Sequence, residues 1–592
     1  MIDYDNCRSL PAMFFAVAAE RGSRPFLWAK RDGTYQSLSW GEAARLVNRL
    51  ARGLVVLGVQ PGDRVVLASE NRPEWALADL AIMSAGAITV PAYTTNTVDD
   101  HRHVFGNSGA RVVIASKPPV SDRAAEAAAQ VPSVEATIVM EPGPQGARGW
   151  DEVLALGDAQ TDDIAGRVAA LGPDDIACII YTSGTGGVPK GVLLSHRNIL
   201  ANAAGAFHLL EMFGLGDEVF LSFLPLSHSY EHTAGLMFPI SIGAQIYFAE
   251  GADTLAANLL EARPTIMTAV PRLYETLHQR IRRGIEREKG LKRRLFEAAV
   301  TIGKSRLAGD RLGMGQRLLD PLLDKLVRAK VRDRFGGRLK AMVSGGAPLN
   351  PEIGAFFLAL GVQLLQGYGQ TEASPVIACN RPGGNKIDSV GTALKGVAIK
   401  IAEDGEILVA GANVMKGYWN DPEATARTIA DGWLKTGDIG FLDAENYLRI
   451  TDRKRDFIKN SGGDMIAPAK VEGALTLAHE IAQAMVWGDQ RPHLVAILVP
   501  DPEFTRHICG PGADLTALAD HQGLQKALSD VVTAVNAKLP PIERVRRFII
   551  AREPFTTGNG QLTPTLKIRR HVVRSIYGEA LDALYEGRSA AA

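Results

Sequence analysis

The sequence has few cysteines and no pattern that would bring them together. Cys7, Cys178, Cys379 and Cys509 lie far apart, and none belongs to a CxxC or Cys/His cluster. Neither a disulfide framework nor a cysteine metal site is therefore expected. This usage fits a reducing compartment.

Long apolar runs are also missing. No window approaches the roughly 20 uninterrupted apolar residues of a membrane-spanning helix. The best candidate, 236–249, contains Pro239, Gly243 and Gln245, and we predict a buried strand and turn there. The opening MIDYDNCRSL is acidic and lacks the apolar run of a signal peptide.

The chain as a whole has no excess of charge of either sign. It contains 65 Lys/Arg and 65 Asp/Glu, so no global field attracts nucleic acid. Locally, residues 272–340 hold 20 Lys/Arg against 8 Asp/Glu. This basic region is either a solvated pair of helices or a face that lies against anionic lipid.

Short apolar runs are abundant, and they alternate with amphipathic stretches such as 40–58. This alternation predicts buried strands in parallel α/β sheets, and the length of the chain predicts more than one domain. The predicted strands are 64–69, 111–116, 177–182, 218–226, 244–249 and 265–270.

The pattern changes after Gly391. Residues 397–409 predict short strands with a turn at 403–405, and the charged run DRKR ends at Arg455. About 140 residues of mixed α and β character follow, enough for one small domain. We therefore predict an N-terminal domain, 1–454, and a C-terminal domain, 455–592.

The stretch YTSGTGGVPKGV, residues 181–192, follows a predicted strand directly. Glycine-rich turns after strands bring backbone N–H groups close to phosphate. A Walker A loop would need Gly-Lys-Ser/Thr at its end, whereas Lys190 lies between Pro189 and Gly191. A plain surface turn is the other alternative, but it leaves the conjunction of hydroxyls and lysine unexplained.

YTSGTGGVPKGV resembles the signature of adenylate-forming enzymes, the superfamily of acyl-CoA synthetases, firefly-type luciferases and peptide-synthetase adenylation domains. Other segments are similar to further motifs of this superfamily and come in the same order, so that the resemblance covers about residues 10–585. The overall pattern is most similar to long-chain fatty acyl-CoA synthetases. These segments are LPLSHSYEHTAG (224–235), VPRLYE (270–275), VSGGAPL (343–349), QGYGQTEAS (366–374), KTGDIG (435–440), TDRKRDFI (451–458) and LTPTLKIRR (562–570).

The resemblance implies a fold. The large N-terminal domain would contain two doubly wound α/β subdomains and a small β-barrel-like subdomain. A small, mobile α+β domain would follow it. Rotation of this domain about a hinge at Arg455 would exchange the groups presented to the substrate.

The resemblance also implies nucleotide-binding residues. Tyr368 would pack on the adenine, Thr371 would contact the α-phosphate, and Glu372 would hold Mg²⁺. Asp438 would accept hydrogen bonds from the ribose hydroxyls, and Arg453 would contact ribose or phosphate. The remaining residues of the implied ATP site are Thr182, Ser183, Gly184, Thr185, Gly186, Lys190, Gly346 and Ala347.

Two further residues would carry the reaction. His228 would line the passage between the acyl and thiol sites. Lys567 would bridge the carboxylate and the α-phosphate, where two anions meet and positive charge is needed. No nucleophilic Ser or Cys constellation is present or required, since the thiol comes from the second substrate.

The sequence departs from the family pattern at four positions. Gly186 stands where a second Thr is usual, and Asp452 where Gly is usual. At the hinge, Arg455 replaces the more frequent Asp or Lys. Asp464 stands where a basic or amide residue is frequent. None of these departures removes a core catalytic role.

The resemblance implies activation of a long-chain fatty acid by ATP and Mg²⁺ and transfer of the acyl group to CoA. Three alternatives stay open: loading of a carrier protein instead of CoA, a luciferase-like oxidase, and a non-enzymatic nucleotide or lipid sensor. Thr371, Glu372, Asp438 and Lys567 argue against the sensor. We expect a cytoplasmic protein, with no nucleic-acid partner and a peripheral contact of residues 272–340 with the inner membrane face or with CoA phosphates. Chain length and oligomeric state stay open.

Overall fold

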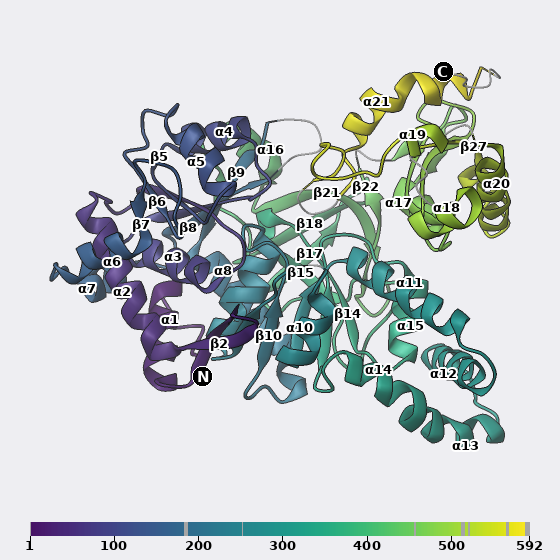
Figure 1. Cartoon of the computed structure of the whole chain (residues 1–592), viewed down its shortest axis with the longest axis horizontal. Helices are drawn as coiled ribbons and strands as arrows, with labels where there is room; N and C mark the ends of the chain where they lie inside the picture. The colour runs from purple at the N-terminus through teal and green to yellow at the C-terminus, as the bar shows by residue number, and fades with distance from the viewer. Residues whose placement is uncertain are drawn as a thin grey trace.

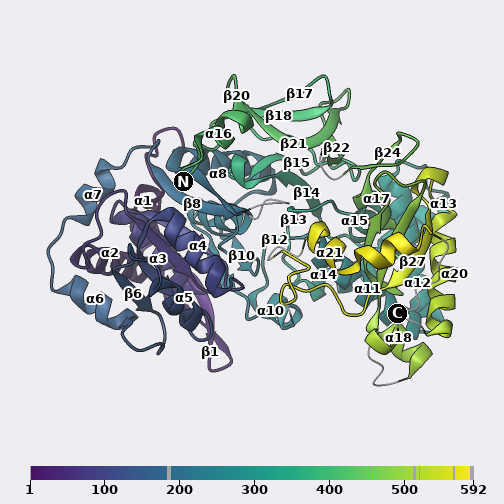
Figure 2. The ribbon, with the colours of Figure 1, turned by 90° about the horizontal axis from the view of Figure 1, so that it is seen from above.

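The computed structural model describes residues 2–182, 188–251, 253–454, 457–510, 515–518, 521–563 and 567–586. Two large sheets form the bulk of the molecule (Figure 1). Seen from above, the N-terminal elements lie at the left, a small third sheet at the top and the C-terminal elements at the right (Figure 2).

The first sheet has eight strands and is parallel in its centre. Alternate residues of its strands enter different cores. Val65 and Leu67 pack with α2 (Trp40–Val56) and α3 (Pro73–Ser84), whereas Val66 and Ala68 pack with α4 (Val98–Ser108) and α5 (Val120–Ala128). Helices on both faces are the doubly wound arrangement. In sheet order the strands are β19 (Gly417–Tyr418), β9 (Lys190–Ser195), β8 (Ile176–Thr182), β4 (Ile88–Ala92), β3 (Arg64–Ala68), β5 (Ala110–Ala115), β6 (Ala136–Val139) and β7 (Arg148–Gly149).

The second sheet has nine strands and repeats this plan. Phe220 belongs to the core under α8 (His196–Leu210), while its neighbour Leu221 belongs to the core under α15 (Pro351–Ala359). In sheet order the strands are β16 (Thr392–Ala393), β15 (Val376–Cys379), β14 (Leu364–Gly369), β13 (Ala341–Ser344), β12 (Ile266–Ala269), β10 (Val219–Ser222), β11 (Gln245–Phe248), β1 (Pro25–Arg31) and β2 (Thr34–Ser39).

The predicted strand and turn at 236–249 is only half correct. Residues 231–237 form the π-helix η2 (Glu231–Met237) and 238–241 form α9 (Phe238–Ser241), before β11 begins at Gln245. Pro239 lies in the first turn of α9, directly after η2. The predicted strand at 218–226 likewise ends earlier, at Ser222.

The third sheet is small and antiparallel. It contains β17 (Val397–Ile401), β18 (Glu406–Gly411), β20 (Ile429–Ala430), β21 (Trp433–Leu442) and β22 (Leu448–Arg453). The predicted turn between β17 and β18 is confirmed, and Gly405 has the positive φ of +83° that favours glycine there.

The C-terminal elements have their own sheet and cores. The strands β25 (Ile481–Trp487), β26 (Leu494–Pro500) and β27 (Val545–Ile550) form a mixed sheet. α17 (Pro468–Leu475) and α20 (Gln522–Asn536) contribute to one core, and α21 (Arg570–Ala583) to the other. A short hairpin, β23 (Ile458–Lys459) and β24 (Met465–Ile466), precedes them.

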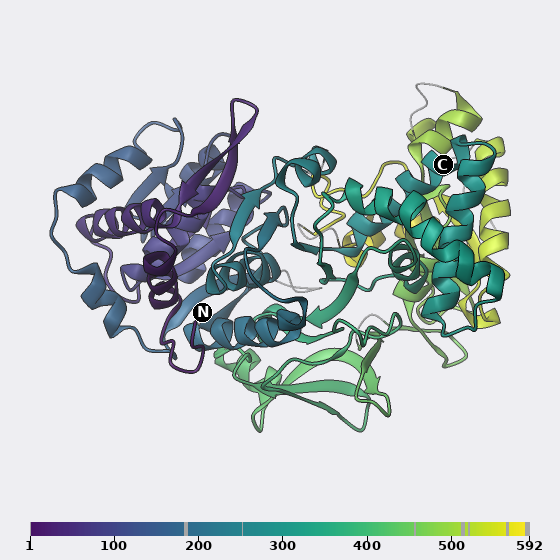
Figure 3. The same cartoon turned by 90° about the horizontal axis from the view of Figure 1, so that it is seen from below.

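Helix α11 (Pro271–Arg287) contacts these C-terminal elements. Figure 3 shows the teal helices of this part of the chain on the same side of the molecule as the yellow-green C-terminal elements. Arg272 Nη1 donates to the Ala482 carbonyl over 3.0 Å. Arg283 forms ion pairs with Asp501 at 2.6 Å and Glu503 at 3.1 Å. Part of the basic region therefore faces the protein itself.

Beyond α11 the chain forms a helical extension made of α12 (Leu291–Leu307), α13 (Met314–Leu323), the π-helix η3 (Asp324–Arg328) and α14 (Ala329–Arg334). Across the described residues, no helix is both long enough and apolar enough to span a membrane.

Candidate active site

The glycine-rich stretch connects two antiparallel strands. β8 ends at Thr182, β9 begins at Lys190, and these two residues are paired in an antiparallel register. A Walker A loop joins a strand to a helix, so the hairpin argues against that alternative. Ser183, Gly184, Thr185 and Gly186 lie outside the described residues.

At the end of this hairpin, Lys190 belongs to a network of polar contacts whose other members, Asp421 and Tyr418, were not predicted from the sequence. Its Nζ lies 3.0 Å from Asp421 and 5.3 Å from the ring centroid of Tyr418. The Tyr418 hydroxyl donates to Glu372 Oε1 over 2.9 Å. These contacts link the hairpin of β8 and β9 to Glu372 in the segment QGYGQTEAS. The linking residues, Tyr418 and Asp421, belong to neither motif.

Local sequence explains why Tyr418 and Asp421 lie there. Tyr418 belongs to β19, which pairs with β9 so that Tyr418 faces Val192. Asp421 caps α16 (Pro422–Thr428) by accepting a hydrogen bond from the Ala424 amide, and this bond and Lys190 lower its pKa. The segment YWNDPEAT carried the signal, an Asp-Pro helix start directly after an aromatic strand end.

The segment QGYGQTEAS makes a sharp bend at the end of β14. A Cβ on Gly369 would lie 1.8 Å from the Pro375 carbonyl oxygen, so only glycine fits. After it, the 3₁₀ turn η4 (Thr371–Ala373) carries Thr371 and Glu372. The bend places both side chains at the carboxyl edge of the second sheet, where ligands bind in open α/β sheets.

Tyr368, Asp438 and Arg453 meet, although they come from three separate motifs. The Tyr368 hydroxyl donates to Asp438 Oδ2 over 2.6 Å, and Arg453 Nε lies 3.3 Å from Asp438 Oδ1. Asp438 on β21 and Arg453 on β22 are register partners. Burial, and next the charge of Asp438, raise the pKa of Tyr368 well above its usual value.

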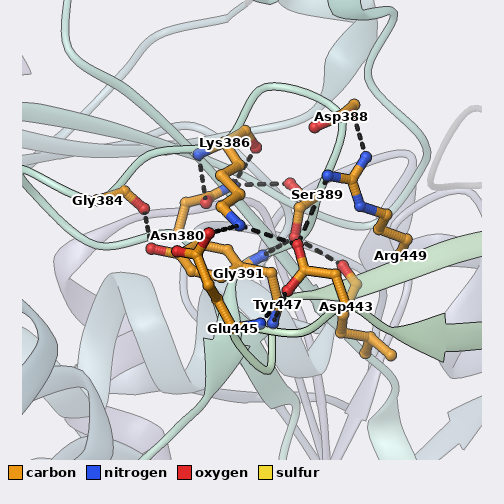
Figure 4. A network of polar contacts seen from close by, with 11 residues as sticks. Asn380, Gly384, Lys386, Asp388, Ser389, Gly391, Asp443, Glu445, Tyr447 and Arg449 are labelled. Carbon is orange, nitrogen blue, oxygen red and sulfur yellow. Dashed lines mark hydrogen bonds and ion pairs between the residues drawn. The ribbon is translucent and has the colours of Figure 1, made fainter.

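A second network anchors the turn between β21 and β22 to the loop that follows β15 (Figure 4). Lys386 Nζ lies 2.9 Å from Asp443, 3.1 Å from Glu445 and 4.2 Å from the ring centroid of Tyr447. Its ammonium lowers the pKa of Asp443 to about 2. Because the turn is tied down, the two strands that carry Asp438 and Arg453 are held against the second sheet.

His228 lies between Thr371 and the C-terminal elements. Its neighbour Ser229 is 3.0 Å from Thr371, Oγ to Oγ1, and its own Nδ1 accepts from the Tyr230 amide over 3.2 Å. Burial, and after it the positive charge of Lys567, lower the pKa of His228 to about 4. Lys567 is therefore close enough to act on His228, although its loop belongs to the C-terminal elements.

The loop after β13 completes this edge of the second sheet. A Cβ on Gly345 would lie 3.0 Å from the Tyr230 ring, whose hydroxyl donates to the Val343 carbonyl over 2.9 Å. Gly346 follows with φ +82°, and Ala347 is exposed. The expected adenine loop thus lies directly beside the His228 turn.

The remaining predicted positions lie apart from these contacts or outside the described residues. Arg455 is not among the described residues. Asp464 hydrogen-bonds to Asn460 within the β23–β24 hairpin, and Asp452 accepts from the Arg453 amide. Across the described ranges, no group of three His, Cys, Asp or Glu side chains could hold a metal ion by itself.

Comparison with known families and proteins agrees with this arrangement. Residues 14–419 match the model of the AMP-binding enzymes, and residues 455–589 match that of the AMP-binding enzyme C-terminal domain. The long-chain-fatty-acid–CoA ligase FadD15 of Mycobacterium bovis is 35% identical over 567 residues, covering 94% of this chain and 93% of the relative. The peroxisomal long chain acyl-CoA synthetase 6 of Arabidopsis thaliana is 32% identical and covers 94% of this chain and 82% of its own.

A solved structure shares both fold and some sequence with this chain. The A domain of a carboxylic acid reductase from Segniliparus rugosus, in complex with AMP and a co-purified carboxylic acid, superimposes with a TM-score of 0.77 at 25% identity. The match covers 98% of this chain and 94% of the other. The predicted fold class is therefore confirmed.

Proposed function

The chain belongs to the AMP-binding enzyme family, and we propose that within it the protein activates long-chain fatty acids and transfers them to CoA. The observation that carries the proposal is the convergence of Tyr368, Asp438, Thr371, Glu372 and His228 with Lys567 at one sheet edge. A nucleotide, a carboxylate and a thiol need such a mixture of aromatic, acidic and cationic groups.

The reaction has two steps. The fatty-acid carboxylate oxygen attacks the α-phosphorus of ATP, the bond to the bridging oxygen breaks, and pyrophosphate leaves with that electron pair. The CoA sulfur then attacks the acyl carbonyl carbon, and AMP leaves with the oxygen of the mixed anhydride. The thiol proton is lost to a base or to water.

The nucleotide roles follow from the contacts. Tyr368 offers an aromatic face to the adenine, and its hydrogen bond orients Asp438 toward the ribose hydroxyls. Arg453 supports the same carboxylate and reaches toward ribose or phosphate. Thr182, Lys190 and the glycine-rich turn would surround the β- and γ-phosphates, while Gly346 and Ala347 would border the adenine.

The reacting groups would meet between Thr371 and Lys567. Thr371 is held by Ser229 and would contact the α-phosphate. Lys567 bridges the two anions of the first step, where each positive group placed in advance lowers the barrier. His228 is uncharged at neutral pH because its pKa is low, so it lines the acyl passage without competing for the anions.

Glu372 fits a magnesium ligand. Carboxylate oxygens suit this hard ion, which is usually held by one or two protein groups and by the phosphates of its substrate. Its Oε1 is fixed by Tyr418, and its Oε2 has no hydrogen bond to any described residue. When bound, Mg²⁺ would neutralise the charge that develops on the leaving pyrophosphate.

The boundary between the domains belongs to the same proposal. We place it between residues 454 and 455, with Arg455 as the hinge. Rotation there would withdraw Lys567 after the first step and present 458–464 for the second. The cytoplasm is the proposed compartment, and reversible contact with a membrane is the proposed mode of attachment.

Release of pyrophosphate from ATP and Mg²⁺ tests the proposal directly, measured over acids from acetate to oleate, with and without CoA. We expect release to be greatest with long chains and to yield AMP and acyl-CoA. Release without any CoA thioester would support carrier loading instead. No release with any acid would contradict the proposal.

A further inference from the structure

Half of the 20 cations in the basic region 272–340 form ion pairs with acidic residues among the described part of this chain. The ion pairs lie within the helical extension, against the second sheet or against the C-terminal elements. They include Arg283–Asp501, Arg287–Glu503, Lys304–Glu352, Arg306–Asp320, Arg328–Asp320, Arg332–Asp324 and Lys340–Glu218. The region as a whole is therefore not a uniform basic face.

Helix α13 is different, because it exposes a stripe of apolar side chains. Met314 is 83% exposed, Leu318 79% and Leu322 48%, and they recur every four residues. Leu326, in the following η3, extends the stripe at 39% exposure. Residues four apart lie on the same side of a helix, so the stripe is a continuous ridge.

The opposite face of α13 is well packed. Leu323 is fully buried in a cluster with Ala299 and Ile302 of α12, and Leu319 packs against the same cluster. The helix is therefore held in place by its inner face alone. Removing the side chains of the ridge should leave the fold intact, since they bury little in the protein.

Cations without a partner accompany the ridge. Arg311, Arg317 and Lys325 are all exposed, and among the described residues none of them has an ion pair. The acids of α13 and η3 are already engaged, Asp320 by Arg306 and Arg328, and Asp324 by Arg332. An apolar ridge bordered by unpaired cations is typical of a helix that lies in a membrane interface.

We propose that α13 docks on an anionic lipid surface, with Met314, Leu318 and Leu322 inserted among the acyl chains. Figure 1 shows α13 at the outer edge of the molecule, beyond α12. A ridge that projects from the body suits a planar bilayer, and Arg311, Arg317 and Lys325 complement its negative headgroups. The inference deepens the proposed function, because a long-chain acid partitions into the same bilayer.

Vesicle flotation of the full chain tests this proposal. The probes are vesicles of phosphatidylcholine alone and of phosphatidylcholine with phosphatidylglycerol. The ridge variant is Met314→Ser/Leu318→Ser/Leu322→Ser. A matched control, Met212→Ser/Leu260→Ser/Ile542→Ser, removes three exposed apolar side chains from other parts of the surface.

We expect the ridge variant to lose about tenfold or more in partition into the phosphatidylglycerol vesicles, and the control to bind like the wild type. Arg311→Gln/Arg317→Gln/Lys325→Gln should lose about fivefold per cation at low salt, and nothing on phosphatidylcholine alone. Unchanged binding of the ridge variant, or equal loss in the control, would overturn the proposal. So would a dimer of the wild type that the ridge substitutions dissociate, because the occupant would then be a second copy.

These experiments can refute the docking proposal and the proposed function independently of each other. Flotation requires no turnover, so an inactive protein that binds vesicles through α13 would refute only the proposed function. Conversely, the ridge variant should keep wild-type pyrophosphate release with a short, water-soluble acid in the absence of vesicles. Loss of that activity in the ridge variant would mean that α13 supports the fold, and would overturn the assignment.

Discussion

Lys567 lies close enough to His228 for its charge to act on the imidazole, although the two residues belong to different parts of the fold. Burial first, and Lys567 second, bring the pKa of His228 to about 4. His228 is therefore uncharged at neutral pH. Lys567 thus acts on the turn of His228, whose neighbour Ser229 contacts Thr371, where the proposed first step brings two anions together.

Replacing Lys567 by alanine should therefore slow adenylate formation by about a hundredfold or more, the usual cost of removing a group that stabilises a transition state. The second step should be spared when acyl-AMP is supplied. Pyrophosphate release and thioester formation from acyl-AMP, measured separately, check both expectations. Lys538→Ala, at another exposed lysine of the C-terminal elements, is the control. Full adenylation by Lys567→Ala would contradict the assignment.

Tyr418→Phe removes one hydroxyl and leaves the ring beside Lys190. Glu372 would then lose the donor that fixes its Oε1. A neutral hydrogen bond contributes about 0.5–1.5 kcal/mol, and one to a charged group somewhat more. We expect a roughly threefold to tenfold rise in the Mg²⁺ concentration needed for half-maximal pyrophosphate release.

Tyr447→Phe provides the matched control for that experiment. Its hydroxyl also donates a short hydrogen bond, 2.6 Å to the Gly384 carbonyl, but within the network of Figure 4. It should lower stability without changing the Mg²⁺ dependence. Equal shifts in both variants would mean that Tyr418 acts on the fold rather than on Glu372.

The elements of the fold were largely predictable because their patterns are local. The strand at 64–69 and the helix at 40–58 were found almost to their ends, since a buried apolar run marks the strand and an amphipathic pattern marks the helix. The helices at 231–241 were missed because their apolar run has no distinguishing period. Tyr418 and Asp421 were missed because their roles depend on the pairing of β19 with β9, a contact between distant segments.

The site was predictable only through the resemblance. Composition and spacing indicated a phosphate loop at 181–192, and nothing in them linked Tyr368 to Asp438 or His228 to Lys567. Those relationships arise when parallel strands end at the same edge of a sheet and when the C-terminal elements pack against it. Single-sequence periodicity carries no information about such contacts.

Asp438→Ala should raise the KM for ATP about tenfold or more with a smaller change in kcat. The substitution removes the proposed ribose acceptor and leaves the Tyr368 hydroxyl without its 2.6 Å partner. ATP titrations at saturating acid and CoA measure the effect. Asp388→Ala, which breaks an exposed ion pair with Arg449, should leave the KM unchanged. An unaltered ATP dependence in Asp438→Ala would exclude the ribose role.

The contact of Arg283 with Asp501 and Glu503 holds the C-terminal elements in the orientation that brings Lys567 to His228. Arg283→Ala should lower the adenylation rate severalfold, because that orientation becomes less populated. Transfer to CoA from supplied acyl-AMP should be unchanged or faster. Arg280→Ala, an exposed arginine on the same helix, is the control. Equal slowing of both steps by Arg283→Ala would indicate general destabilisation instead.

Glu231 gives a test by pH. Burial raises its pKa from 4.5 to about 7, although the Thr268 hydroxyl donates to it over 2.6 Å. The folded state therefore prefers the protonated form. Its contribution to stability is fully present below pH 4.5 and is lost as the pH rises through 7.

Glu231→Gln keeps the neutral shape, so the free energy of unfolding of the wild type should fall relative to this variant as the pH rises. At about 1.4 kcal/mol per pKa unit, the difference should grow by at most about 3.5 kcal/mol between pH 4.5 and 8. Urea unfolding across this window measures it, with the exposed Glu126→Gln as the control. A difference in the free energy of unfolding that stayed constant with pH would contradict the prediction. Glu231 would then be ionised in the folded protein throughout this window. Its carboxylate would need a cationic partner, which the contact with Thr268 does not provide.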